Sequence, residues 1–90
     1  MDHKTKFTLY DEQGETTEIT LDKFVADELP TIAGDVHAWL QHCFDMAASG
    51  LLPGSAVRLR GKNTPAARRR AIGDAVRSYA LRQITDTIGI

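Results

Sequence analysis

The arginine-rich segment in the second half of the chain holds the residues whose types and spacing bear most directly on chemistry. Arg68, Arg69 and Arg70 follow Thr64-Pro65, a pair typical of a helix start. Helix starts carry a partial positive charge and usually attract acidic side chains. Three cations at this place favour anion binding, because guanidinium groups bind phosphate through paired hydrogen bonds. The predicted nucleic-acid or anion-binding residues are Arg58, Arg60, Lys62, Arg68, Arg69, Arg70 and Arg77.

Three features of the same segment weigh against a simple nucleic-acid site. Successive helical residues are separated by about 100°, so the arginines do not share one face. Arg70 also lies four residues before Asp74, a spacing that favours an ordinary ion pair on a solvated helix. Tyr79 is the only aromatic residue between positions 57 and 90, which argues against a stacking platform for single strands.

The residue types used in metal binding and catalysis do not form a recognisable pattern. His37, His42 and Cys43 are near one another, but the two histidines are separated by about 140° around a helix and cannot converge on one ion. The serines lie in no strand–turn–helix setting of the kind that activates a nucleophile. We therefore expect no catalytic residues, no metal site, no cofactor and no enzymatic activity.

The net charge of −1 conceals a strong asymmetry between the two halves. Residues 1–56 contain ten acidic and three basic side chains, whereas residues 57–90 contain eight basic and two acidic ones. Either the basic half has a polyanionic partner, or the two halves face each other and neutralise one another. The acidic residues are also a predicted surface for a protein partner, or simply protect an edge strand from aggregation. They are Asp11, Glu12, Glu15, Glu18, Asp22, Asp27 and Glu28.

Length and composition indicate one globular domain over residues 1–90. Apolar residues make up 42% of the chain and charged residues 26%. A single cysteine, Cys43, excludes an internal disulfide framework. The N-terminus does not resemble a signal peptide, and no segment is apolar enough to span a membrane. We expect a cytoplasmic protein without a membrane partner.

The first half of the chain is predicted to form a β-hairpin followed by a short helix. Apolar residues alternate with polar ones over residues 6–10 and 17–21, which is typical of half-buried strands. The polar segment between them ends in Gly14 and favours a tight turn. Asp22 is a suitable cap for a helix from Lys23 to about Glu28, which Pro30 is expected to stop.

The second half is predicted to contain two helices with a short strand between them. An apolar stripe follows Asp35 and ends at Gly50, with Leu51 packing back on the last turn. Residues 57–60 alternate as a strand, and a long helix starts at Pro65. The element order is β-β-α-α-β-α, a small α+β fold whose antiparallel sheet has its helices on one side. The buried face of the last helix is expected to contain Ile72, Val76, Tyr79, Ala80 and Ile84.

These observations favour a non-enzymatic regulatory module that contacts nucleic acid, or a nucleoprotein complex, through the segment from Arg58 to Arg70. The alternative is a protein-interaction module, such as a small phage- or mobile-element-type inhibitor that docks on a larger protein machine. In that case the acidic half is expected to mimic nucleic acid. A homodimer is a third interpretation, with an exposed apolar patch formed by Leu51, Leu52, Ile88 and Ile90.

Overall fold

The chain folds into a two-stranded antiparallel sheet and three helices, in the order β-β-α-α-α. The computed structural model describes residues 4–52 and 64–88. The predicted strand at residues 57–60 lies outside this range, and the α+β class with helices beside a small antiparallel sheet agrees with the prediction. The elements are β1 (Lys4–Tyr10), β2 (Thr16–Asp22), α1 (Lys23–Ala33), α2 (Val36–Ala48) and α3 (Pro65–Ile88).

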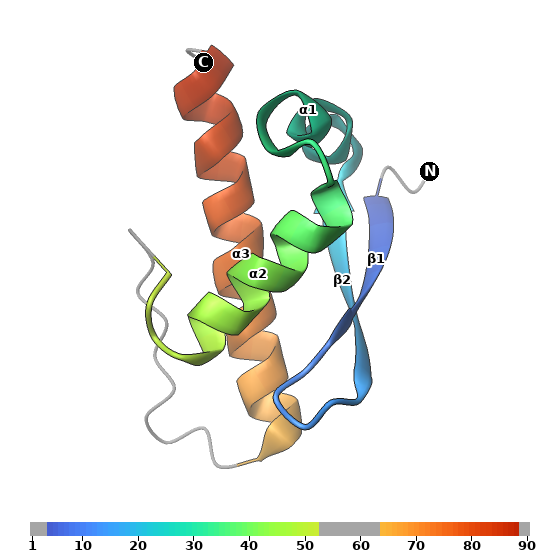
Figure 1. Ribbon diagram of the computed structural model, residues 1–90, viewed down its shortest axis with the longest axis vertical. Coiled ribbons are helices and arrows are strands. Elements are labelled where there is room, and N and C mark those ends of the chain that lie inside the picture. Colours follow the sequence, from blue (N-terminus) through green and yellow to red (C-terminus); the bar gives the residue numbers. More distant parts are fainter. Residues whose placement is uncertain (1–3, 53–63, 89–90) are drawn as a thin grey trace.

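The hairpin formed by β1 and β2 buries one face and exposes the other. Phe7 pairs with Ile19, and Leu9 with Thr17, so apolar residues of both strands point to the same side. Leu9, Ile19 and Leu21 are buried there. All three helices lie on this side of the sheet (Figure 1). The alternate residues of β1, which include Lys4 and Lys6, are exposed on the opposite face.

The loop of the hairpin is held by its own hydrogen bonds. Gly14 takes a positive φ of 79°, and its N–H donates to the carbonyl of Asp11 over 3.1 Å. One carboxylate oxygen of Asp11, Oδ1, accepts hydrogen bonds from the N–H groups of Gln13 (2.9 Å) and Glu15 (3.0 Å). The predicted hairpin is confirmed, and these bonds fix the direction in which the loop presents Asp11 and Glu12.

Helix α1 continues through Pro30, so the predicted end of this helix near Glu28 is wrong. Proline removes one backbone hydrogen bond from the helix interior. Leu29, however, is completely buried, and its packing keeps the backbone helical despite the steric restriction before proline. The helix ends instead at Gly34, where φ is 73° and the N–H donates to the carbonyl of Pro30 over 3.1 Å.

Helix α2 has the predicted cap at each end. Asp35 accepts a hydrogen bond from the N–H of Ala38, and Gly50 has a φ of 73°. The N–H groups of Gly50 and Leu51 donate to the carbonyls of Ala47 and Met46, which is a Schellman ending.

The leucine pair after α2 differs from the sequence-based predictions. Leu51 does not pack on the last turn, because its residue is 68% exposed, whereas Leu52 is only 4% exposed and enters the core. The left-handed backbone of Gly50 turns the chain so that the second leucine faces inward. Leu51 and Leu52 therefore do not form one exposed patch, and the side chain of Ile88 and all of Ile90 lie outside the described part.

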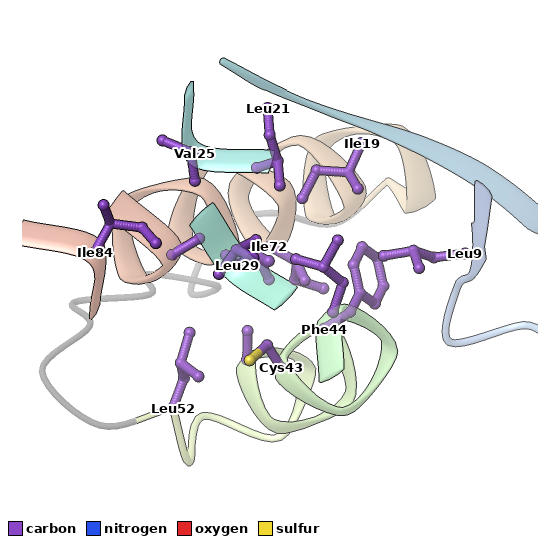
Figure 2. Packing of buried hydrophobic residues seen from close by; sticks show 14 residues of the cluster. Leu9, Ile19, Leu21, Val25, Leu29, Cys43, Phe44, Leu52, Ile72 and Ile84 are labelled. Atoms are coloured by element: carbon purple, nitrogen blue, oxygen red, sulfur yellow. The ribbon is translucent and has the colours of Figure 1, made fainter. Parts of the chain in front are cut away.

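The hydrophobic core receives side chains from every element. Helix α3 contributes Ile72, Val76, Ala80 and Ile84, all completely buried as predicted. Tyr79 is only partly buried and stacks on Trp39 of α2, with ring centroids 5.8 Å apart. Figure 2 shows the core side chains of the sheet, of α1 and of α2 meeting those of α3. This packing joins the hairpin to α3 and so sets the position of the hairpin loop.

Two glycines are expected to respond to alanine in opposite directions. Gly50→Ala places a Cβ in left-handed backbone, which lowers the free energy of unfolding by about 1 kcal/mol. Gly73 lies inside α3, where a new Cβ meets Arg77 Nη1 at an ordinary 3.7 Å, so Gly73→Ala raises it by about 0.5–1 kcal/mol. Chemical denaturation of both variants measures the two changes. Stabilisation by Gly50→Ala contradicts the capping geometry.

Candidate functional site

The arginine-rich start of α3 lies beside the loop of the hairpin (Figure 1). Thr64 caps the helix, because its Oγ1 accepts a hydrogen bond from the N–H of Ala67 over 3.1 Å. The helix begins at Pro65, so Arg68, Arg69 and Arg70 lie in its first two turns, as the sequence predicts. The other predicted basic residues before this helix, Arg58, Arg60 and Lys62, lie outside the described residues.

Arg68 forms a two-pronged ion pair with Glu12 of the hairpin loop. Its Nε donates to Glu12 Oε2 over 2.7 Å, and its Nη2 donates to Oε1 over 2.5 Å. Both side chains keep about a third of their surface exposed, 31% for Arg68 and 34% for Glu12. The hydrogen bond lowers the pKa of Glu12 and raises the pKa of Arg68. Both groups are therefore charged at neutral pH.

Arg69 makes a longer contact with Asp11, the residue next to Glu12. Its Nη1 lies 3.4 Å from Asp11 Oδ2. The side chain of Asp11 is only 3% exposed. Desolvation by burial tends to raise the pKa of this carboxyl, but hydrogen bonds from the N–H groups of Gln13 and Glu15 and from Arg69 outweigh it and lower the pKa. Asp11 is therefore a fixed anion beside Arg69.

We call these four residues, Asp11, Glu12, Arg68 and Arg69, the loop–helix cluster. Together with Gln13 and Pro65 they line one surface depression. The acidic and basic halves of the chain meet here, 56 and 58 residues apart in the sequence. The contacts in the loop–helix cluster therefore fit the interpretation that the two halves of the chain neutralise one another.

The two remaining predicted arginines of α3 differ from this pair and from each other. Arg70 is exposed, and its side chain makes no hydrogen bond or ion pair within the described residues. The expected pair between Arg70 and Asp74 does not form, because Asp74 binds Arg77 three residues later instead of Arg70 four residues earlier. Arg77 lines a different depression together with Lys4 and Asp22. The structure thus brings Arg68 and Arg69 together beside the hairpin loop, whereas Arg70 lines another depression with Asp74, the partner of Arg77.

The predicted acidic surface is largely engaged in ion pairs within the chain. Besides the two members of the loop–helix cluster, Asp22 pairs with Lys4 over 2.9 Å and Asp27 with Lys23 over 3.0 Å. Glu18 lies 3.8 Å from Lys6. Within the described part, only the side chains of Glu15 and Glu28 among the seven predicted residues form no ion pair or hydrogen bond. The seven therefore do not form a continuous surface of unpaired charge.

Sequence reasoning missed two side chains of α2 that hold the outer edge of β1. Gln41 accepts a hydrogen bond from the N–H of Tyr10 over 2.8 Å and donates to its carbonyl over 2.9 Å. His37, one turn earlier, contacts the carbonyl of Thr8 over 2.5 Å. The spacing of four residues between two polar side chains is a signal for such a contact, but it does not identify the strand. These bonds anchor the end of β1 that leads into the loop–helix cluster.

The described residues also bear on metal binding and membrane insertion. No group of three metal-ligating side chains comes together within residues 4–52 and 64–88. Cys43 is buried, and desolvation raises the pKa of its thiol to about 11, so it is a protonated core residue. None of the helices in this part of the chain combines the length and the apolar character of a membrane span.

Comparisons with protein-family models, curated proteins and solved structures find no match to this chain. The class of protein is therefore defined by the fold alone: a small α+β fold with a two-stranded antiparallel sheet packed on three helices.

Proposed function

We propose that this chain is a non-enzymatic binding module that contacts the phosphates of nucleic acid through the start of α3. The residues assigned to this contact are Arg68, Arg69 and Arg70. The observation that carries the proposal is the two-pronged bond of Arg68 to the carboxylate of Glu12. A guanidinium group binds two phosphate oxygens through the same pair of N–H groups.

The arrangement of the three arginines favours a ligand with several phosphates over one small anion. Three consecutive helical positions spread their side chains over about 200° of the helix circumference. Such side chains reach different anionic groups more easily than they converge on one. Arg70 supports this choice, because it is exposed and makes no ion pair within the described residues. Arg58, Arg60 and Lys62 precede the helix in the sequence and are proposed to extend the same contact.

The proposal is tested by fluorescence anisotropy with labelled duplex DNA and duplex RNA across a range of salt concentrations. Phosphate contacts release counterions, so the logarithm of the association constant is expected to fall linearly with the logarithm of salt concentration. Three arginine contacts with duplex DNA give a slope of about −3. Absence of binding at about 0.05 M salt, both by the unmodified chain and by variants that lack the carboxylates beside these arginines, contradicts the proposal, because screening of such contacts is weak at low salt.

A second candidate is a module that docks on a protein partner, and the exposure of Phe24 favours it. This residue at the start of α1 is 49% exposed and lines a depression with Asp22, Lys23 and Asp27. An aromatic ring within a charged rim is typical of protein interfaces. On this alternative, Phe24→Asp abolishes capture of a protein partner without changing any binding to nucleic acid. Equal capture of the partner protein by the unmodified chain and by the Phe24→Asp variant contradicts this alternative.

A further inference from the structure

We infer that the hairpin loop is an intramolecular competitor that lowers the affinity of α3 for nucleic acid, with Glu12 and Asp11 acting on Arg68 and Arg69. This inference rests on the proposed function. It assigns a regulatory role to carboxylates that sequence analysis placed on a separate, protein-binding surface.

Glu12 occupies two N–H donors of Arg68 that a phosphate also binds. Its two oxygens accept from Nε and Nη2 of Arg68, at 2.7 and 2.5 Å. A phosphate bound through two oxygens on this side of the guanidinium uses the same two N–H groups. The carboxylate and the phosphate therefore exclude each other on this edge of the Arg68 guanidinium.

The contact between Arg68 and Glu12 is able to open. Both side chains retain about a third of their exposed surface, so water and ligand reach the pair from outside. The carboxylate of Glu12 has no other hydrogen-bond or ion-pair partner within the described residues. Rotation of one exposed side chain at the loop is therefore sufficient to release Arg68, without rearrangement of the core.

Asp11 acts differently from Glu12. Its Oδ1 holds the N–H groups of Gln13 and Glu15, so this carboxylate stays in place when the turn is intact. Its other oxygen lies 3.4 Å from Arg69, which is longer than a strong charged hydrogen bond. Asp11 leaves part of Arg69 available but repels any phosphate that approaches it. The loop thus contributes one movable competitor and one fixed negative charge.

The test compares two double variants that change the net charge equally. In Asp11→Asn/Glu12→Gln, the asparagine Oδ1 can still accept both turn hydrogen bonds, while both negative charges are lost. The control is Asp22→Asn/Asp27→Asn, which also removes two ion-paired carboxylates, near the opposite end of the hairpin (Figure 1). Asp22 makes no side-chain cap hydrogen bond to α1, so that helix is expected to remain.

The dissociation constant for duplex DNA at low salt is the measured quantity. We expect the loop variant to bind about tenfold more tightly than the unmodified protein, and the control less than about twofold more tightly. Glu12→Gln alone, which leaves the turn intact, is expected to give about a threefold gain. Circular dichroism establishes that each variant is folded.

The outcomes separate this inference from the proposed function. If the unmodified protein binds DNA but the loop variants bind no more tightly, or the control gains as much, the inference is overturned and the proposed function stands. If neither the unmodified protein nor the loop variants bind at low salt, both are overturned. Binding by the loop variants alone supports both.

Discussion

Replacing Leu40 by alanine is expected to lower the free energy of unfolding by about 2–5 kcal/mol. Leu40 lies in the middle of α2, is completely buried and belongs to the cluster that all five elements share. Alanine is a good helix former, so the loss arises from missing packing and from the cavity left behind. This loss is a large part of the total free energy of unfolding expected for a chain of 90 residues, which is roughly 5–13 kcal/mol.

Leu51→Ala is the matched control for this experiment. The same side-chain atoms are removed only a few residues beyond α2, but Leu51 is 68% exposed. A change within about 0.5 kcal/mol is expected for this variant. Urea denaturation monitored by circular dichroism measures both. Equal losses for the two leucines are incompatible with the different burial of these positions.

The second large effect is expected from Arg68→Gln/Arg69→Gln/Arg70→Gln. Glutamine preserves helix propensity and removes the three charges proposed to contact phosphate. The affinity for duplex DNA is expected to fall about a hundredfold or more at about 0.05 M salt. The slope of the logarithm of the association constant against the logarithm of salt concentration is expected to become less negative by about three. The reduction in slope identifies the loss as electrostatic, because a folding defect lowers the amount of active protein without changing the slope.

A charge-matched control replaces the three lysines of residues 4–52 by glutamine. Lys4 and Lys6 lie in β1, and Lys23 starts α1, and none of the three lines the depression of the loop–helix cluster. This variant loses as many positive charges as the arginine variant. We expect a loss of less than about threefold. A similar loss for the lysine and arginine variants means that net charge, and not the start of α3, determines binding.

Local sequence signals predict most of the fold because the caps and apolar stripes act over a few residues. Asp35, Gly50 and Thr64 each mark the helix end that they cap in the structure. The rule that a proline ends a helix fails at Pro30, because the helix is kept there by the burial of Leu29, which depends on tertiary packing and not on local sequence. A local rule also misses that Leu52, and not Leu51, is buried, because the position of the core beside this turn depends on the rest of the fold.

The candidate site is only half visible in the sequence. The run from Arg68 to Arg70 identifies a concentration of cations, and the loop identifies a concentration of acids. Their contact joins residues 56 and 58 positions apart, and no local pattern determines which acid meets which base. The bonds of Gln41 to Tyr10 contribute to this contact by fixing the end of β1, across 31 positions. Charge asymmetry allowed both a separated and a paired arrangement, and packing of the hairpin beside α3 selects the paired one.

The most direct test of the central claim is an NMR titration of the arginine Nε–Hε resonances with duplex DNA at low salt. The start of α3 is predicted to respond, with shifts for Arg68, Arg69 and Arg70. Glu12 is expected to lose its contact, so the Arg68 resonance should move most. Arg77, paired with Asp74, serves as the internal reference and should change little. Shifts of Arg77 alone, or no arginine shifts at saturating DNA, contradict phosphate binding at the start of α3.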